Sequence, residues 1–128
     1  MIVIFKMQLI RVRLIEKGNE GCELAPVEIM KGMRDVKSVD VDKLDLEEIH
    51  VDLDNVGEAN HLIFENSKEI FEMNDRAFFI GGDNSINYSL FKGFDKVVNG
   101  IVVIFDASAN CGLGGWVRRL VENGFNGR

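Results

Sequence analysis

Oxygen-bearing side chains at alternate positions follow an apolar run near the end of the chain. Residues 101–105 read IVVIF, and Asp106, Ser108 and Asn110 come directly afterwards. In an extended or turning segment, residues two apart face the same way, so these three side chains can converge on one point. Carboxylate, hydroxyl and amide oxygens are ligands for hard cations such as magnesium, manganese or calcium. Because only one of the three carries a charge, the residues by themselves favour weak metal binding or none.

A glycine-rich turn with an acidic residue follows a second apolar run upstream. Residues 77–80 read AFFI and are followed by Gly81, Gly82, Asp83, Asn84 and Ser85. The glycine pair allows a sharp backbone turn, and Ser85 is placed to cap the next helix. Exposed backbone N–H groups at such a helix start can hold an anion. Many turns between a strand and a helix have this composition, so a structural role is the favoured interpretation of this stretch alone.

The remaining candidate groups are isolated from one another in the sequence. His50 and His61 are the only histidines, and we expect both to be surface or partly buried side chains rather than ligands. Cys22 and Cys111 have no zinc-ligand spacing with either histidine, and we expect them to pack rather than react.

Strands that alternate with helices must position the two strand ends. A short run that is β-branched and apolar on both faces, such as 101–105, predicts a strand buried on both sides of a sheet. Alternation of strands and helices predicts a three-layer α/β/α fold with a mainly parallel sheet. An acidic residue at the end of such a strand lies where open α/β sheets bind ligands. Strands are expected within residues 2–15 and over 49–53, 77–80 and 101–105, and helices from Pro26, from Asn55, over 86–97 and from Trp116.

Length, charge and cysteine content restrict the class of protein. With 128 residues, the chain is expected to form one domain over residues 1–128. Its net charge of −6 argues against a nucleic-acid partner. The apolar runs are far shorter than the roughly 20 residues that cross a bilayer, so no membrane association is expected. Two cysteines give no disulfide framework, which predicts a cytoplasmic location.

Taken together, the two strand ends resemble the arginase/agmatinase (ureohydrolase) family. Members carry GGDHS after one strand and DAHxD after the next, and this chain has GGDNSI followed about twenty residues later by FDASAN. GCELAP at Gly21–Pro26 is similar to the family's loop into its first helix. The helix expected over Asn55–Asp75 and the WVRRLVENGF stretch fit the same layout. The resemblance covers nearly the whole chain, but only the N-terminal part of a usual member.

The family reaction is hydrolysis of a guanidino C–N bond by hydroxide that bridges two manganese ions. By this resemblance, Asn84 stands where members have a ligand histidine, and Asp106 keeps the first aspartate of DAHxD. Ser108 and Asn110 stand in place of its histidine and last aspartate, and Asp83 matches a residue that supports the site. The resemblance gives the neighbouring residues Gly81, Gly82 and Ser85 a supporting role as well. A guanidino small molecule is the ligand that the resemblance implies.

These replacements predict a family member that is inactive on its own. Each lost unit of charge at a metal site is worth on the order of several kcal/mol, so a tight manganese pair is not expected. Two other interpretations stay open. One is an active arginase/agmatinase-type hydrolase that a partner chain completes. The other is a small flavodoxin-like domain that binds an anion or a nucleotide at Gly81–Ser85.

The resemblance also raises a question about the sheet. In the family, strands from the C-terminal half separate the two strands that carry these motifs. Here the two strands are expected either to close up, in the flavodoxin-like order 2-1-3-4, or to leave a gap that another chain fills. Because an exposed apolar sheet edge promotes association, we expect a homo-oligomer.

Overall fold

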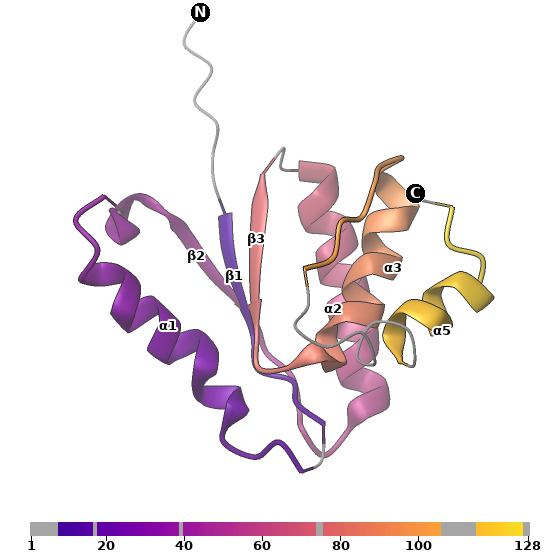
Figure 1. Ribbon diagram of the computed structural model, residues 1–128, viewed down its shortest axis with the longest axis horizontal. Helices are drawn as coiled ribbons and strands as arrows, with labels where there is room; N and C mark the ends of the chain where they lie inside the picture. Colours follow the sequence, from indigo (N-terminus) through magenta and orange to yellow (C-terminus); the bar gives the residue numbers. More distant parts are fainter. Residues whose placement is uncertain (1–7, 17, 39, 74–75, 106–114, 127–128) are drawn as a thin grey trace, which may run out of the picture.

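Three parallel strands form the centre of the protein, in the order β2-β1-β3 (Figure 1). The computed structural model describes residues 8–16, 18–38, 40–73, 76–105 and 115–126. The strands are β1 (Gln8–Val12), β2 (Asp45–Ile49) and β3 (Ala77–Gly81). Ile10 of β1 lies opposite Glu47 of β2 and Phe79 of β3. The parallel sheet and its central first strand confirm the α/β prediction.

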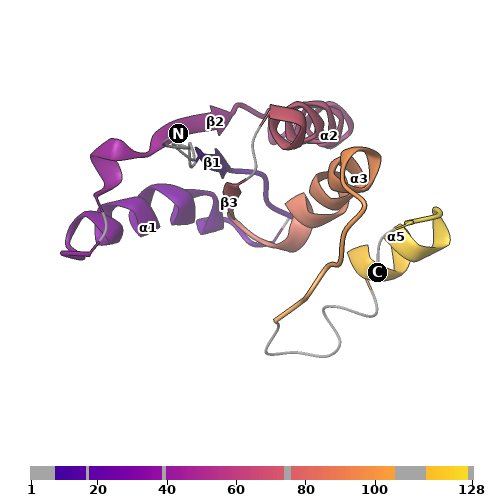
Figure 2. The same ribbon diagram turned by 90° about the horizontal axis from the view of Figure 1, so that it is seen from above.

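Helices cover both faces of this sheet, which gives three layers (Figure 2). On one face lies α1 (Ala25–Arg34), and on the other lie α2 (Val56–Met73) and α3 (Asn87–Val97). The short helix α5 (Trp116–Glu122) packs against α3, where Trp116 stacks on Phe91 with ring centroids 5.1 Å apart. The described residues also form three 3-10 turns: η1 (Cys22–Leu24), η2 (Val41–Lys43) and η3 (Asn84–Ile86).

The main core lies between the sheet and the α2–α3 pair. Alternate residues of β1, Ile10 and Val12, are fully buried there against Ile63 of α2 and Leu90 of α3. Leu9 points to the opposite face, where it joins Met30 of α1 in a smaller cluster. This alternation follows from the two-residue period of a strand. Within the described part of the chain, no helix has the length and apolar character needed to cross a bilayer.

The start of α2 has the capping arrangement that its sequence predicts. The Glu58 backbone N–H donates to Asn55 Oδ1 at 3.2 Å, and Asn55 Nδ2 donates back to Glu58 Oε2 at 3.0 Å. We therefore expect Asn55→Ala to lower the free energy of unfolding by about 1 kcal/mol, because a helix N–H loses its acceptor. Asn55→Asp, which keeps an acceptor, should cost less. Urea denaturation of the three proteins measures both values, and equal losses for both variants would contradict the capping role.

The predicted strand over residues 101–105 is wrong. These residues adopt neither helix nor strand, and the side chains of Ile101 and Phe105 are 71% and 96% exposed. Strand formation depends on packing against neighbouring strands more than on the backbone itself, and no strand of the described chain pairs with this segment. The order 2-1-3 is present, whereas the fourth place of the 2-1-3-4 order is not occupied by these residues.

Candidate functional site

The candidate site begins at the carboxyl ends of β1 and β3. These two strands are neighbours and parallel, so the loop after Val12 and the turn after Gly81 emerge at the same edge of the sheet. Asp83, in the turn between β3 and η3, is where the two loops meet. Its Oδ2 accepts hydrogen bonds from the Glu16 backbone N–H and from Asn19 Nδ2, both at 2.8 Å. Its Oδ1 accepts from the Ser85 backbone N–H at 2.9 Å.

The hydrogen bonds of Asp83 determine its charge. Burial by itself raises the pKa of this carboxyl, but the hydrogen bonds from Asn19, Ser85 and Glu16 outweigh burial and lower the pKa below 3.8. Asp83 is therefore a carboxylate at neutral pH. This carboxylate links the loop after β1 to the turn η3 through its hydrogen bonds.

This arrangement predicts an acid-dependent loss of stability. The pKa of Asp83 is lower in the folded chain than its ordinary value of 3.8. The carboxylate therefore adds to the free energy of unfolding above pH 3.8, and this addition is lost as the pH falls through the pKa of the folded state. We expect Asp83→Asn to destabilise the protein by on the order of 1 kcal/mol at pH 7. The difference between the two proteins should shrink below about pH 4. Urea denaturation from pH 3 to 7 tests this, and a difference that is constant with pH would contradict the role of the charge.

Gly81 and Gly82 serve close packing. A Cβ on Gly82 would lie 2.7 Å from Ile15 Cγ2 and 2.9 Å from the Cys22 carbonyl oxygen, and one on Gly81 would overlap the Ile86 side chain. Neither residue has a positive φ, so the backbone dihedrals of this turn do not require glycine. Instead, the missing side chain at Gly82 lets the backbone of η1 come close, and the missing side chain at Gly81 leaves room for Ile86 of η3. Positive φ values occur at Gly18 and Gly21 in the facing loop (101° and 100°).

Asn84 and Ser85 differ in what they present to the surface. The side chain of Asn84 is exposed, and its Oδ1 accepts from Asn87 Nδ2 at 3.2 Å. Ser85 contributes its backbone N–H to Asp83, so the capping side chain belongs to Asp83 and the prediction of Ser85 as the cap is wrong. Asp106, Ser108 and Asn110 lie outside the residues that the structure describes. Their convergence on one point stays a prediction.

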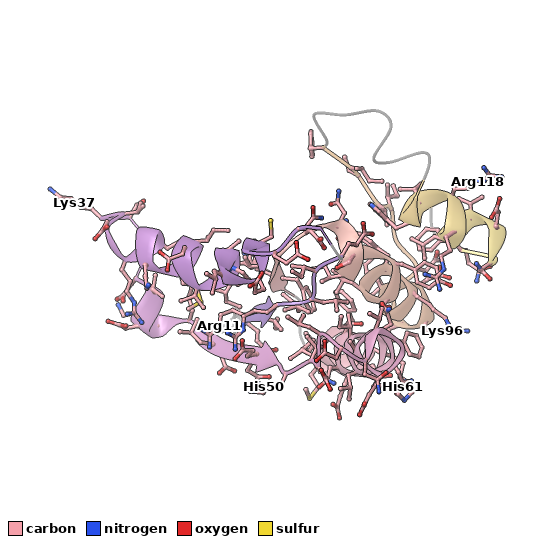
Figure 3. The ribbon with its side chains drawn as sticks, turned by 90° about the horizontal axis from the view of Figure 1, so that it is seen from below. Arg11, Lys37, His50, His61, Lys96 and Arg118 are labelled. Carbon is pink, nitrogen blue, oxygen red and sulfur yellow. The ribbon has the colours of Figure 1, made fainter. Side chains whose placement is uncertain are left out.

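The two histidines lie on separate elements (Figure 3). His50 follows β2 and approaches Glu48, with 3.6 Å between Nδ1 and Oε2, and His61 is exposed on α2. Both are surface groups, as predicted. Cys22 is exposed, so its predicted packing role is wrong. Among the described residues, His, Cys, Asp and Glu side chains do not gather in groups of three or more that could hold a metal ion.

A groove of about 580 Å³ runs beside β3 from Asp83 toward the other end of the strand. Asp83, Asn84 and Asn87 line it, while Phe71, Phe79 and Phe94 supply aromatic surface. The Phe71 ring lies 5.4 Å from each of the other two rings, measured between centroids. Sequence patterns place these phenylalanines on the inner sides of their elements but do not indicate an open groove.

A model of the arginase family matches residues 9–111 of this chain. The chain belongs to the arginase family. The GGDNSI turn and all of β1 but its first residue lie within the matched range, so the two loops that Asp83 joins are part of the shared arginase fold. A sequence search of curated proteins gave no significant match.

Among solved structures, formimidoylglutamase from Bacillus subtilis subsp. subtilis str. 168 matches with a TM-score of 0.78 at 21% identity. The match covers 95% of this chain and 45% of that protein. This arginase-family chain therefore spans less than half the length of the enzyme that it resembles. At this identity the likeness establishes the shared fold.

The described part of the site does not fit the manganese pair that enzymes of the arginase family bind. Asp83 already accepts three hydrogen bonds, two of them from the loop after β1. Asn84 offers a neutral amide oxygen, and that oxygen accepts from Asn87. A neutral amide oxygen brings no negative charge to a divalent ion, so Asn84 offers weaker binding than an anionic ligand. No catalytic step through a metal follows from these residues.

Proposed function

We propose that this chain is a non-catalytic member of the arginase family, inactive in manganese-dependent hydrolysis of guanidino compounds. One observation carries the proposal: the side chains of Asp83 and Asn84 are both engaged in hydrogen bonds within the protein. The carboxylate accepts hydrogen bonds from the facing loop and from Ser85 of η3, and the Asn84 amide oxygen accepts from Asn87 at the start of α3.

The chemistry of the remaining positions supports the same conclusion. A metal pair activates water because its charge lowers the pKa of the bound molecule, and strong anionic and imidazole ligands hold the ions in place. At the corresponding positions this chain offers Asp106 as the one carboxylate, with Ser108 and Asn110 beside it in sequence. A hydroxyl and an amide supply neither the charge nor the ligand strength for two divalent ions.

The structure disfavours the alternative of an anion-binding turn. The Ser85 backbone N–H, which such an anion would need, donates instead to Asp83. A carboxylate already occupies the start of the helix, and its negative charge repels a phosphate. We therefore propose that this domain serves in binding or interaction and does not bind a nucleotide at this turn. From its cysteine content we also expect the protein in the cytoplasm.

Urea release from arginine or agmatine, measured with added Mn²⁺, tests the proposal. We expect the full chain to stay at the background rate under conditions in which an active arginase, as the control, turns over. Turnover above background would overturn the proposal. Calorimetric titration with MnCl₂ alone separates the remaining alternative, because tight uptake by the isolated chain would favour an enzyme that a partner completes. Titration with arginine or agmatine then tests whether guanidino binding persists without hydrolysis.

A further inference from the structure

The outer edge of β3 has no partner strand from the residues that the structure describes. β3 pairs with β1 on one side, and no strand of the described chain pairs with it on the other. Its free backbone groups therefore border the groove that Phe79, Phe91 and Phe94 line. Phe78, on the same strand, is 53% exposed. An unpaired apolar edge of this kind accepts an additional strand readily.

Residues 101–105 have the complementary properties. The segment follows α3 and lies apart from the three strands of the sheet (Figure 2). It is apolar throughout and has the same length as the five-residue strand β3. Val103, at its centre, is 69% exposed, although β-branched residues favour the packed environment of a sheet. The chain thus presents an unpaired strand-forming segment and an unpaired strand edge.

We infer that two copies of this chain associate by reciprocal strand exchange, in which residues 101–105 of each copy add to the β3 edge of the other. This inference concerns assembly and does not depend on the proposed lack of catalysis. Each copy would then fill the other's groove with uncharged side chains.

The surface available is large enough for a specific dimer. The exposed apolar side chains that would be covered are Phe78, Ile101, Val103, Ile104 and Phe105. They amount to roughly 600 Å² per copy if a large apolar side chain offers about 150–200 Å². Two copies together would bury about 1,200 Å² or more, which reaches the range of specific interfaces.

Charge opposes association only at long range and not within the proposed contact itself. Each chain carries a net charge of −6, so two copies repel each other at long range. Neither β3 nor residues 101–105 contain an ionisable side chain, so the contact brings no charges of the strands together. Added salt should therefore strengthen the dimer, because it screens the repulsion between the remaining surfaces.

Light scattering of the full chain after size-exclusion chromatography tests the inference. We expect the wild-type molar mass at about 100 µM to be that of a dimer, and Val103→Asp to reduce it twofold, since a buried strand cannot hold an unpaired charge. Val121→Asp is the matched control, because Val121 on α5 is 67% exposed and lies outside the patch. A monomeric wild type, or a Val103→Asp variant that stays dimeric, would overturn the inference. Circular dichroism establishes that each variant is folded.

Cross-linking identifies which copy provides the strand. In a background with Cys22→Ser and Cys111→Ser, one protein carries Phe78→Cys and a second carries Val103→Cys. A short bismaleimide should link the two into a covalent heterodimer when they are mixed. A protein that carries both substitutions and yields only internally linked monomer would show that each chain's own segment occupies the edge, and this outcome would refute the exchange.

Discussion

Replacement of Asn84 by His, Ser108 by His and Asn110 by Asp together is expected to raise the affinity of this chain for Mn²⁺ by at least about 100-fold. The three substitutions recreate the family pattern around Asp106, which the sequence retains. They add two imidazoles and one carboxylate, the groups that bind divalent transition metals in proteins. All three positions lie within residues 9–111, the range that matches the arginase family model.

Titration calorimetry with MnCl₂ measures this gain. A matched control replaces Asn87, rather than Asn84, by His, with the other two substitutions kept, because Asn87 is an amide in the same hydrogen-bonded pair. We expect most of the gain to be lost in the control. Tight binding by the wild type would contradict the proposed function, whereas no gain in the restored variant would contradict the assignment of these positions by resemblance.

The parts of the fold that local sequence determines were predictable. The Asn55–Glu58 cap, the apolar stripe of α2 and the short strand Ala77–Gly81 each follow from residues close to one another in the chain. The bounds of the elements were less predictable. The strand expected over residues 49–53 lies at Asp45–Ile49. Pro26, expected as the first residue of its helix, is the second residue of α1. Such shifts are small, since the ends of elements depend on tertiary contacts.

Features that depend on distant partners were not predictable. The apolar run at 101–105 has the composition of a buried strand, but its state depends on whether another strand lies beside it. Asp83 was assigned a supporting role by resemblance, yet its partners Glu16 and Asn19 lie 67 and 64 residues away in sequence. Composition also does not indicate that a side chain at position 82 would collide with the backbone of Cys22.

Gly93 is a second glycine whose role only the packing reveals, and its substitution should have the other large effect. It is buried in α3 where this helix lies against α2. A Cβ there would lie 3.0 Å from the Phe64 carbonyl oxygen and 3.1 Å from the Lys68 backbone nitrogen, and would overlap the Ser67 hydroxyl. Backbone atoms cannot turn aside as a long side chain does, so the two helices would have to separate. We expect Gly93→Ala to lower the free energy of unfolding by about 1–3 kcal/mol.

The same substitution at Gly32 provides a control of opposite sign. Gly32 is an exposed residue of α1, and a Cβ there would meet no atom within 4 Å. Alanine at this position should stabilise the protein by about 0.5–1 kcal/mol, because it reduces the entropy of the unfolded chain and favours the helix. Urea denaturation of both variants measures the difference. Ser67→Ala combined with Gly93→Ala should recover only part of the loss, since removal of the hydroxyl leaves the two backbone contacts in place. Full recovery would show that the side chain, rather than the backbone of α2, sets the distance between the helices that hold the candidate site.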